Sequence, residues 1–448
     1  MKLTDFLKSA VGSGTQAQTY SKIELFANPG SPSGWSPHRE GISPVYNPDF
    51  YTGNGTGKHH GLQLLDFPFF VVDRQEIDTF KANPSTHLRR FFSPADDEDK
   101  TAHLRMILHP DALRQLPIRR PPDGFIHAYL TVTTRTVLTT YEHAPIFLKL
   151  DYPGIIGRCP RRLDLPQLHM GTFFSQTFDE WSEAGFFSET FGYLPESFGI
   201  LWRFDADQAA VGIIGREFVP RPNVGERRIR IPFFALPSRD HTNPDEPSLL
   251  TQIIHLNTSA SVMPRNVFLH ITRLIFEAVQ SLFAWGQTSN GTLTKYRLMH
   301  DCHGQNLLLE LDGKGMPCRI IFRDFQHMYP VVFDDSASVD GLVDRNPFVK
   351  ILDLRMEPDY VPRKLSQLID HKLGVYVIQR LIDEFCAHFE CRRDMLIADI
   401  RSQFRTLLRE LHVLLPKDRW YRRSDGMEYD KRGRIRLVQG EGMPLLRE

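Results

Sequence analysis

The stretch from His300 to Phe325 (HDCHGQNLLLELDGKGMPCRIIFRDF) constrains the fold more than any other part of the sequence. Leu307–Leu311 and Cys318–Phe322 are short apolar runs with the composition of strands, and Asp312–Gly315 (DGKG) between them has the composition of a turn. The pattern predicts an antiparallel β-hairpin. Because such a hairpin brings its two open ends together, the residues that flank it are expected to lie close to one another.

Chemically competent side chains stand at both open ends of this hairpin. They are Asp301, His303, Gln305 and Asn306 before it, and Arg323 and Asp324 after it. Mg²⁺ prefers hard oxygen ligands, usually one or two carboxylates completed by water and phosphate. We therefore expect Asp324 and the amide oxygen of Asn306 to bind Mg²⁺, while His303 donates to a phosphate oxygen. The alternative is a polar turn in which His303 and Asn306 only satisfy backbone groups.

A second, electropositive set of residues comes earlier in the chain. Thr133, Arg135 and Thr136 follow a strand predicted over Phe125–Val132, and Lys149 ends a second predicted strand. The other members are three arginines of the segment GRCPRR, namely Arg158, Arg161 and Arg162. Guanidinium groups bind phosphate or carboxylate through paired hydrogen bonds, so the set suits the triphosphate of ATP. Alternatively, Lys149 protects an edge strand and the three arginines lie in an ordinary exposed loop.

Composition argues against several functional classes. The 448 residues include 54 Lys plus Arg and 54 Asp plus Glu, so no net charge favours nucleic acid or an anionic membrane. The five cysteines lack CxxC spacing, which argues against a disulfide framework or a zinc site and favours a reducing compartment. The N-terminus lacks the apolar core of a signal peptide, and no stretch of about 18 apolar residues occurs. We expect a cytoplasmic protein without nucleic-acid or membrane partners.

The familiar nucleotide and hydrolase signatures are also missing from the sequence. It contains no Walker loop, no GxGxxG dinucleotide fingerprint and no GxSxG elbow. The residues by themselves therefore predict an enzyme that binds Mg²⁺ and a nucleotide without a glycine-rich phosphate loop.

The chain divides into three predicted regions of an α/β (α+β) protein. Residues 1–60 form a looped segment, residues 61–240 an α/β phosphate-binding region, and residues 249–448 a region with the hairpin and several helices. Ser238–Ser248 has the composition of the linker between the last two. Apolar residues recurring at three or four residue steps predict helices from Pro264 to a stop at Gly286, over Val375–Phe389 and over Asp394–Leu414.

In these motifs the chain resembles the NRPS-independent siderophore (NIS) synthetases, the aerobactin-synthetase (IucA/IucC) family. The family's E-x-H-x-Q-N stretch, hairpin and R-D-F are matched by residues 301–306 (DCHGQN) and 323–325 (RDF). Its S-x-R-T element is matched by residues 133–136 (TTRT), and its lysine and later arginine by Lys149 and Arg161. Further upstream, His109-Pro110 echoes an HPW-like element, and an altered form of the GHPxHP segment covers residues 30–41 and 46–50.

The resemblance implies a hand-like fold of palm, fingers and thumb, with the hairpin in the active site and a helical C-terminal region. It also implies that a carboxylate, often citrate, attacks ATP to form an acyl-adenylate, from which an amine or hydroxyl displaces AMP. Phosphates would be held by Thr133, Arg135, Arg161 and His303, with Lys149 near the nucleotide or the carboxylate. Metal and nucleotide would be positioned by Asp301, Asn306 and Asp324, with Thr136, Arg158 and Gln305 as further nucleotide contacts. A homodimer, usual for the family, is also expected.

Two other functions remain open on the sequence. The D-x-H-x-x-N … D-F arrangement also resembles aminoglycoside-type kinases, in which Asp301 would be the catalytic base and Asp324 the Mg²⁺ ligand. The altered N-terminal motif is instead compatible with a non-catalytic binding protein that derives from the same fold.

Overall fold

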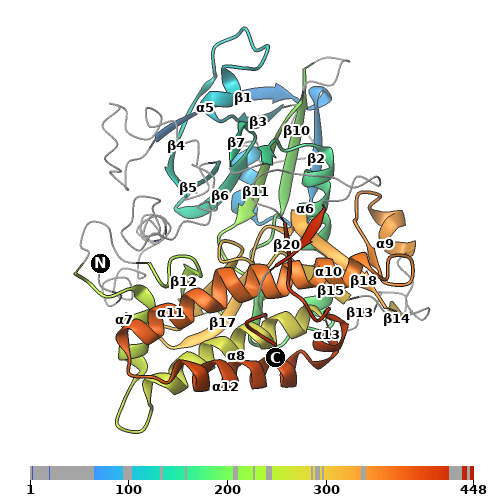
Figure 1. The fold of residues 1–448 in the computed structure, drawn as a ribbon. Coiled ribbons are helices and arrows are strands. Elements are labelled where there is room, and N and C mark those ends of the chain that lie inside the picture. Colours follow the sequence, from blue (N-terminus) through green and yellow to red (C-terminus); the bar gives the residue numbers. More distant parts are fainter. Residues whose placement is uncertain are drawn as a thin grey trace.

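The computed structural model describes Leu3, Tyr20 and residues 65–93, 103–131, 135–156, 159–204, 210–225, 228–238, 245–283, 286–287, 293–294, 297–333, 340–422, 436–440 and 444–447. Figure 1 shows a strand-rich part, coloured blue to green, and a layer of long helices, coloured yellow to red, from the C-terminal half. The hairpin contacts both parts: its second strand packs against the helix Pro264–Leu282, and Leu308 and Ile321 share a small core with Leu138 and Phe147 of the strand-rich part.

Eight antiparallel strands form the largest sheet, in the order β2-β10-β11-β6-β5-β4-β1-β3. Their bounds are β1 Leu65–Asp73, β2 Ile77–Lys81, β3 His103–Ile107, β4 Gly124–Leu130, β5 Thr136–Tyr141, β6 Ala144–Leu150, β10 Phe198–Arg203 and β11 Ala210–Glu217. Helix α4 (Thr86–Phe92) packs near β3, and helix α6 (Leu165–Glu183) contacts β2, β10 and β11. A capping box, in which Asp164 and Gln167 bond each other's backbone N–H groups, fixes the start of α6.

The predicted hairpin is the centre of a second, four-stranded sheet. Its order is β12 (Ile229–Pro232), β16 (Leu307–Leu311), β17 (Pro317–Phe322) and β9 (Phe191–Tyr193). Strands β16 and β17 pair in antiparallel register with Leu307 opposite Phe322, so the two open ends of the hairpin meet as expected. A three-stranded sheet of β15 (Arg297–His300), β18 (Met328–Val332) and β19 (Leu352–Asp353) continues both ends of the hairpin.

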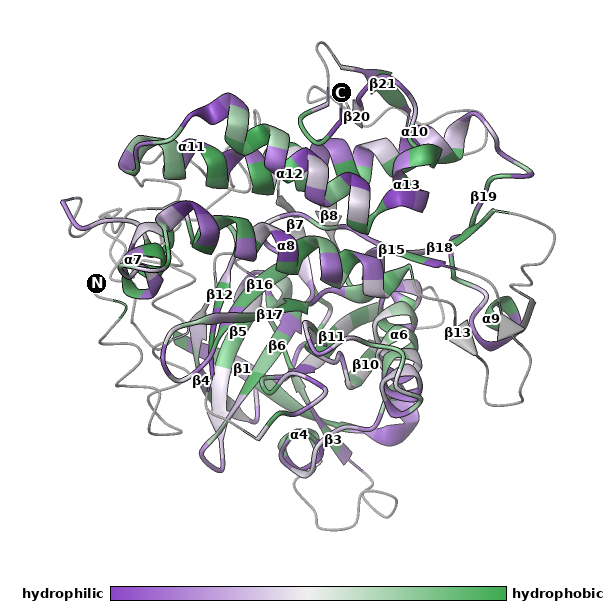
Figure 2. Cartoon of the chain, turned by 90° about the horizontal axis from the view of Figure 1, so that it is seen from below, coloured by the Kyte–Doolittle hydropathy of each residue, from purple (hydrophilic) through white to green (hydrophobic). Residues whose placement is uncertain are grey.

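The helical layer contains α7 (Leu249–Asn257), α8 (Pro264–Leu282), α10 (Tyr360–Ser366), η3 (Gln367–Gln379), α11 (Arg380–His388), α12 (Arg393–Leu407) and α13 (Arg409–Leu414). Figure 2 shows both hydrophobic and hydrophilic residues on α8, α11 and α12, as expected of helices that bury one face. The buried faces form one large core with α6 and the hairpin. No helix among the described residues is long and apolar enough to cross a membrane.

The shorter elements are η1 (Arg74–Glu76), α5 (Pro110–Leu113), β7 (Tyr152–Ile156), β8 (Cys159–Arg161), β13 (Gly286–Gln287), β14 (Leu293–Thr294), η2 (Phe325–His327), α9 (Asp340–Arg345), β20 (Trp420–Arg422) and β21 (Leu437–Gln439).

Two helix predictions need correction. The helix predicted over Val375–Phe389 is the end of a continuous helical run from Tyr360 to His388, whose middle 13 residues, η3, form a π-helix. A search for 3.6-residue periodicity misses such a segment, because its wider turns shift the apolar positions. The helix predicted over Asp394–Leu414 is two helices that meet at Leu408. The helix predicted from Pro264 is α8, which begins there as predicted and ends at Leu282, with Phe283 as its C-cap.

Candidate active site

Lys149 joins the large sheet to the end of the hairpin. It lies on β6, opposite Thr136 of β5 and Ile214 of β11, and its side chain is only 2% exposed. The Lys149 Nζ donates to Asp324 Oδ1 at 2.7 Å and to Gln326 Oε1 at 2.9 Å. Because β6 is an internal strand, the alternative in which Lys149 protects a sheet edge is wrong.

A second buried ion pair, between Glu196 and Arg216, lies next to the pair of Lys149 and Asp324. Glu196 Oε1 accepts a hydrogen bond of 2.6 Å from Arg216 Nη2 and lies 4.0 Å from Lys149 Nζ, while Glu196 Oε2 accepts from the backbone N–H of Phe325 at 3.2 Å. The two cations and two carboxylates (Lys149, Arg216, Glu196 and Asp324) therefore balance in charge. Sequence reasoning missed Glu196 and Arg216. The available signal was charged residues inside two apolar stretches: Glu196 in LPESFGILW, and Arg216 with Glu217 in VGIIGREF.

Burial and neighbouring charges set the pKa values of Lys149 and Asp324. Desolvation lowers the pKa of Lys149 to about 8, although the nearby Asp324 and Glu196 carboxylates act in the opposite direction. Burial alone would raise the pKa of Asp324, but Lys149 and Arg216 outweigh it and hold that pKa well below its usual range. Near neutral pH the site therefore holds an ammonium group and a carboxylate.

Asp324 is held in place by an unusual backbone conformation. Its φ is 70° and its ψ is 78°, a left-handed region that aspartate tolerates better than most residues. The ring Nε2 of His300, on β15, donates to the backbone oxygen of Asp324 at 3.0 Å. This turn redirects the chain at the end of β17 and aims the carboxylate of Asp324 at β6.

Polar contacts also bind together the residues just before β16 and those just after β17. Asn306 Nδ2 donates to the backbone oxygen of Asp301 at 3.0 Å, and Arg323 Nε donates to the backbone oxygen of Gln305 at 2.7 Å. The backbone N–H of Gln305 donates to His303 Nδ1 at 3.2 Å. His303 and Asn306 thus bond backbone groups, as the polar-turn alternative predicted. The role of Asn306 as a metal ligand stays a prediction.

His303 is a neutral hydrogen-bond donor in this arrangement. Burial lowers the pKa of His303 to about 3, even though the Asp301 carboxylate acts in the opposite direction. Since Nδ1 accepts from the backbone, the single ring proton of the neutral imidazole resides on Nε2. His303 can therefore offer an Nε2–H to an anion without carrying a net charge.

Lys372 is a further site residue that sequence reasoning missed. It extends from η3, and its Nζ donates to Asp301 Oδ2. Burial would raise the pKa of Asp301, but Lys372 and His303 outweigh that effect and hold it well below its usual range. The other carboxylate oxygen, Asp301 Oδ1, is buried and has no hydrogen-bond partner among the described residues. Nothing in the sequence around Lys372 (IDHKLGVY) distinguishes it from an ordinary helical lysine.

The remaining predicted residues are only partly placed by the structure. Arg135 and Thr136 are buried beside Lys149: Arg135 accepts a backbone hydrogen bond from Leu150 at 2.8 Å, and Thr136 is the cross-strand partner of Lys149. Thr133 and Arg158 lie outside the described residues, as does the side chain of Arg161, whose backbone belongs to β8. The segments 30–41 and 46–50 also lie outside them.

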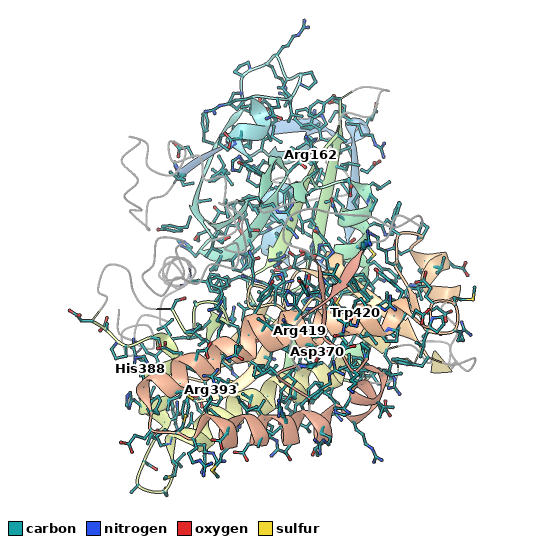
Figure 3. The ribbon with its side chains drawn as sticks, in the orientation of Figure 1. Arg162, Asp370, His388, Arg393, Arg419 and Trp420 are labelled. Carbon is teal, nitrogen blue, oxygen red and sulfur yellow. The ribbon has the colours of Figure 1, made fainter. Side chains whose placement is uncertain are left out.

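Arg162, the last of the three predicted arginines, has a partner of its own. Its Nε lies 3.0 Å from Asp151 Oδ2. Burial raises the pKa of Asp151 to about 6, against the backbone N–H of Leu163 and the guanidinium of Arg162. Figure 3 places Arg162 in the strand-rich part, away from the labelled residues of the helical layer. It is an ion-paired residue and not a member of the Lys149 cluster.

The donor set fits a nucleotide with Mg²⁺. Asp324 and Asp301 are ionised carboxylates, and Asp301 Oδ1 is an orphaned buried oxygen that a cation would satisfy. Within the described ranges, no three His, Cys, Asp or Glu side chains form a protein-only metal cage. Mg²⁺ does not require one, because phosphate and water usually complete its shell.

One family model matches the C-terminal part of the chain. Residues 292–424, which include the hairpin and η3, match the family model described as a ferric iron reductase FhuF-like transporter. Curated proteins give no match to the sequence.

Solved structures match over nearly the whole chain. Aerobactin synthetase IucA of Klebsiella pneumoniae is 15% identical with a TM-score of 0.63, over 99% of this chain and 78% of that one. The ATP-bound form of that protein is 16% identical with a TM-score of 0.61, over 92% of this chain and 71% of that one. Petrobactin biosynthesis protein AsbB of Bacillus anthracis is 14% identical with a TM-score of 0.59, over 92% and 73%. The chain therefore has the mixed α/β fold of the NIS synthetases, and the resemblance seen in its motifs is confirmed for the fold.

Proposed function

We propose that this protein is an ATP-dependent ligase that activates a carboxylate as an acyl-adenylate and condenses it with an amine or a hydroxyl. The observation that carries the proposal is the buried contact between Lys149 and Asp324, which joins the large sheet to the hairpin. The same fold is found in a synthetase whose structure is described as ATP-bound. A buried lysine beside an ionised carboxylate suits a site where polyanions must be bound.

In this reaction an oxygen of the substrate carboxylate attacks the α-phosphorus of ATP. The bond from that phosphorus to the bridging oxygen breaks, and pyrophosphate leaves with its electron pair. The amine or hydroxyl then attacks the acyl carbon, AMP leaves, and the nucleophile loses a proton. Two anions must meet in the first step, so neutralisation of charge and alignment supply most of the catalysis.

The residues divide this work according to their chemistry. We assign phosphate charge neutralisation to Lys149, Arg135 and Arg161, and a neutral hydrogen bond to a phosphate oxygen to His303 Nε2. Further nucleotide contacts are assigned to Thr133, Thr136, Arg158, Asp301 and Gln305. Asp324 and Asn306 would hold Mg²⁺, which supplies charge neutralisation at the phosphates when bound. Asp324 can exchange its contact with Lys149 for a contact with the cation, because both need the same ionised oxygen.

The substrate class follows from the fold relatives, whose names refer to aerobactin and petrobactin. We propose a citrate-like di- or tricarboxylate as the acid, an amine or alcohol as the nucleophile, and siderophore-type biosynthesis in the cytoplasm, with a homodimer as the assembly.

Product analysis tests the proposal directly. The full chain is incubated with ATP, Mg²⁺, a panel of di- and tricarboxylates, and hydroxylamine as a generic nucleophile. Pyrophosphate and AMP together with a hydroxamate are expected with at least one acid. ADP and a phosphorylated acceptor would instead support the kinase alternative, with Asp301 as the base. ATP binding without any turnover would identify a binding protein.

A matched pair of variants links turnover to the site. Lys149→Met removes the buried ammonium group and is expected to abolish pyrophosphate release. Arg203→Met removes an exposed cation of the same sheet that pairs with Asp78, and is expected to retain the wild-type rate. Equal rates in the two variants would contradict the assignment of Lys149.

A further inference from the structure

A short segment near the end of the chain docks against η3 on the side away from the site. Arg447 Nε donates to Asp370 Oδ1 at 3.0 Å, and a second guanidinium nitrogen contacts Asp370 Oδ2. The Asp370 carboxylate is fully buried, and Arg447 is 6% exposed. Because Asp370 is itself part of η3, this paired contact ties residues 444–447 to the π-helix.

Other contacts fix the same segment. Arg401 Nε, on α12, donates to the backbone oxygen of Leu445 at 3.0 Å. Leu446 is 1% exposed and lies over Gly374 of η3, where an added Cβ would be 3.7 Å from Leu446 Cδ1. The docked segment therefore contacts η3 at two positions, Asp370 and Gly374, and is anchored independently on α12.

Asp370 is also bound by the neighbouring part of the helical run. Ser366 Oγ donates to Asp370 Oδ2 at 2.6 Å, and the backbone N–H of Trp420 donates to Ser366 Oγ at 3.1 Å. Figure 3 shows Asp370 and Trp420 near each other in the helical layer. Asp370 is thus a junction for the helix, the strand β20 and the docked segment.

Lys372 leaves η3 only two residues after Asp370, toward the hairpin. Residues two apart on a helix do not share a face, so one side of the π-helix contacts Arg447 while another presents Lys372 to Asp301. π-helical turns are rare and frequently occur at functional sites. One face of η3 is therefore bound by Arg447, and a different face contacts the site through Lys372.

We propose that Arg447 is a positioning residue: its pairing with Asp370 fixes η3 in the place from which Lys372 contacts Asp301 at the hairpin. The catalytic consequence rests on the proposed function, whereas the docking itself does not. At metal sites, removal of a partner that orients a ligating residue typically costs about 10–100-fold in activity, and for Arg447 we expect a loss at the lower end of that range.

Hydrogen exchange tests the docking without any substrate. In Arg447→Met, amides of residues 367–379 are expected to exchange faster than in the wild type, while those of α8 are unchanged. Arg265→Met, which removes an ion pair between α8 and α12, serves as the control and should leave residues 367–379 as they were. Wild-type exchange over residues 367–379 in Arg447→Met would overturn the proposal.

Arg447→Met leaves the buried Asp370 carboxylate unpaired, which could unfold the protein as a whole. A second variant therefore controls for general unfolding. Asp370→Asn combined with Arg447→Met removes both charges together. It is expected to remain folded and still to show faster exchange over residues 367–379. Protection equal to the wild type in this double variant would also overturn the proposal.

Kinetics test whether Arg447 acts through Lys372. Arg447→Met is expected to lower kcat/KM for ATP-dependent pyrophosphate release about tenfold in the wild-type background. In a Lys372→Met background the same change should matter less than about twofold, because the contact that it positions is already gone. Fully multiplicative losses would refute action through Lys372. Absence of pyrophosphate release from the wild type would refute the proposed function alone, and the exchange measurements would still decide the docking.

Discussion

Raising the pH is expected to inactivate the site by deprotonating Lys149. The lysine is 2% exposed, and burial lowers its pKa to about 8 despite the Asp324 carboxylate 2.7 Å away. The pH dependence of kcat/KM reports groups of the free enzyme. Above its pKa the ammonium fraction falls tenfold per pH unit, so kcat/KM should be about tenfold lower at pH 9 than at pH 7.

The assay is pyrophosphate release at subsaturating ATP between pH 6.5 and about 9.5, with hydroxylamine as a nucleophile that is neutral over most of this range. Lys149→Arg is the matched control, because a guanidinium group keeps its charge throughout. It should be slower than the wild type, since the planar group is larger, but its profile should lack the alkaline decline. A flat wild-type profile, or the same decline in Lys149→Arg, would refute the assignment of the ammonium group.

The lowered pKa of Lys149 also predicts how the free energy of unfolding changes with pH. The folded pKa of Lys149, about 8, lies below its ordinary value of 10.5, so the unfolded chain binds more protons between these pH values. The free energy of unfolding should therefore rise with pH across that window in the wild type relative to Lys149→Met. Between pH 7.5 and pH 10 this rise amounts to roughly 2 kcal/mol. Urea unfolding at pH 7.5 and pH 10 measures it, and a difference of the opposite sign would contradict the buried, charged lysine.

Three further perturbations have definite outcomes. His303→Ala should lower kcat/KM by about a hundredfold without unfolding the protein, because a phosphate donor is lost; steady-state kinetics and circular dichroism check this, and an unchanged rate would contradict the role of Nε2. Glu196→Ala should destabilise the chain by about 3 kcal/mol in urea, because it leaves the buried Arg216 unpaired; a loss below about 1 kcal/mol would show that the pair is hydrated. Chelation of Mg²⁺ should abolish pyrophosphate release, and full activity in excess chelator would exclude a required metal.

The local sequence pattern was sufficient to predict the central hairpin. The strand predicted over Leu307–Leu311 is β16, and the returning strand differs from β17 by one residue at its start. Short apolar runs and a glycine-containing turn extend over only a few residues, so the sequence displays them directly. Hairpin topology alone predicted that Asp301 and Asp324 lie in one region, and both carboxylates act on the pKa of His303. Helix α8 was found for the same reason, since its apolar positions repeat at the α-helical period over 19 residues.

The local sequence pattern did not predict which charged residues pair with one another. Lys149 and Asp324 are 175 positions apart, and Lys372 and Asp301 are 71 apart. Such contacts depend on how the sheets and helices pack, and no short window of sequence contains that information. The π-helical form of η3 was also not predicted, because its wider turns shift the apolar positions away from the α-helical period.

The sequence by itself determined which chemistry is available: a hairpin flanked by carboxylates, amides and an imidazole, and a buried-looking lysine on a preceding strand. Its ordered motifs also identified the fold that the solved structures confirm. Only the tertiary structure decided which charges meet. Glu196 and Arg216 complete the Lys149–Asp324 pair, and Lys372 reaches Asp301 from a π-helix. The physical reason is that strand and turn formation follow short-range preferences, whereas the energy of an ion pair depends on distance and desolvation in the folded molecule.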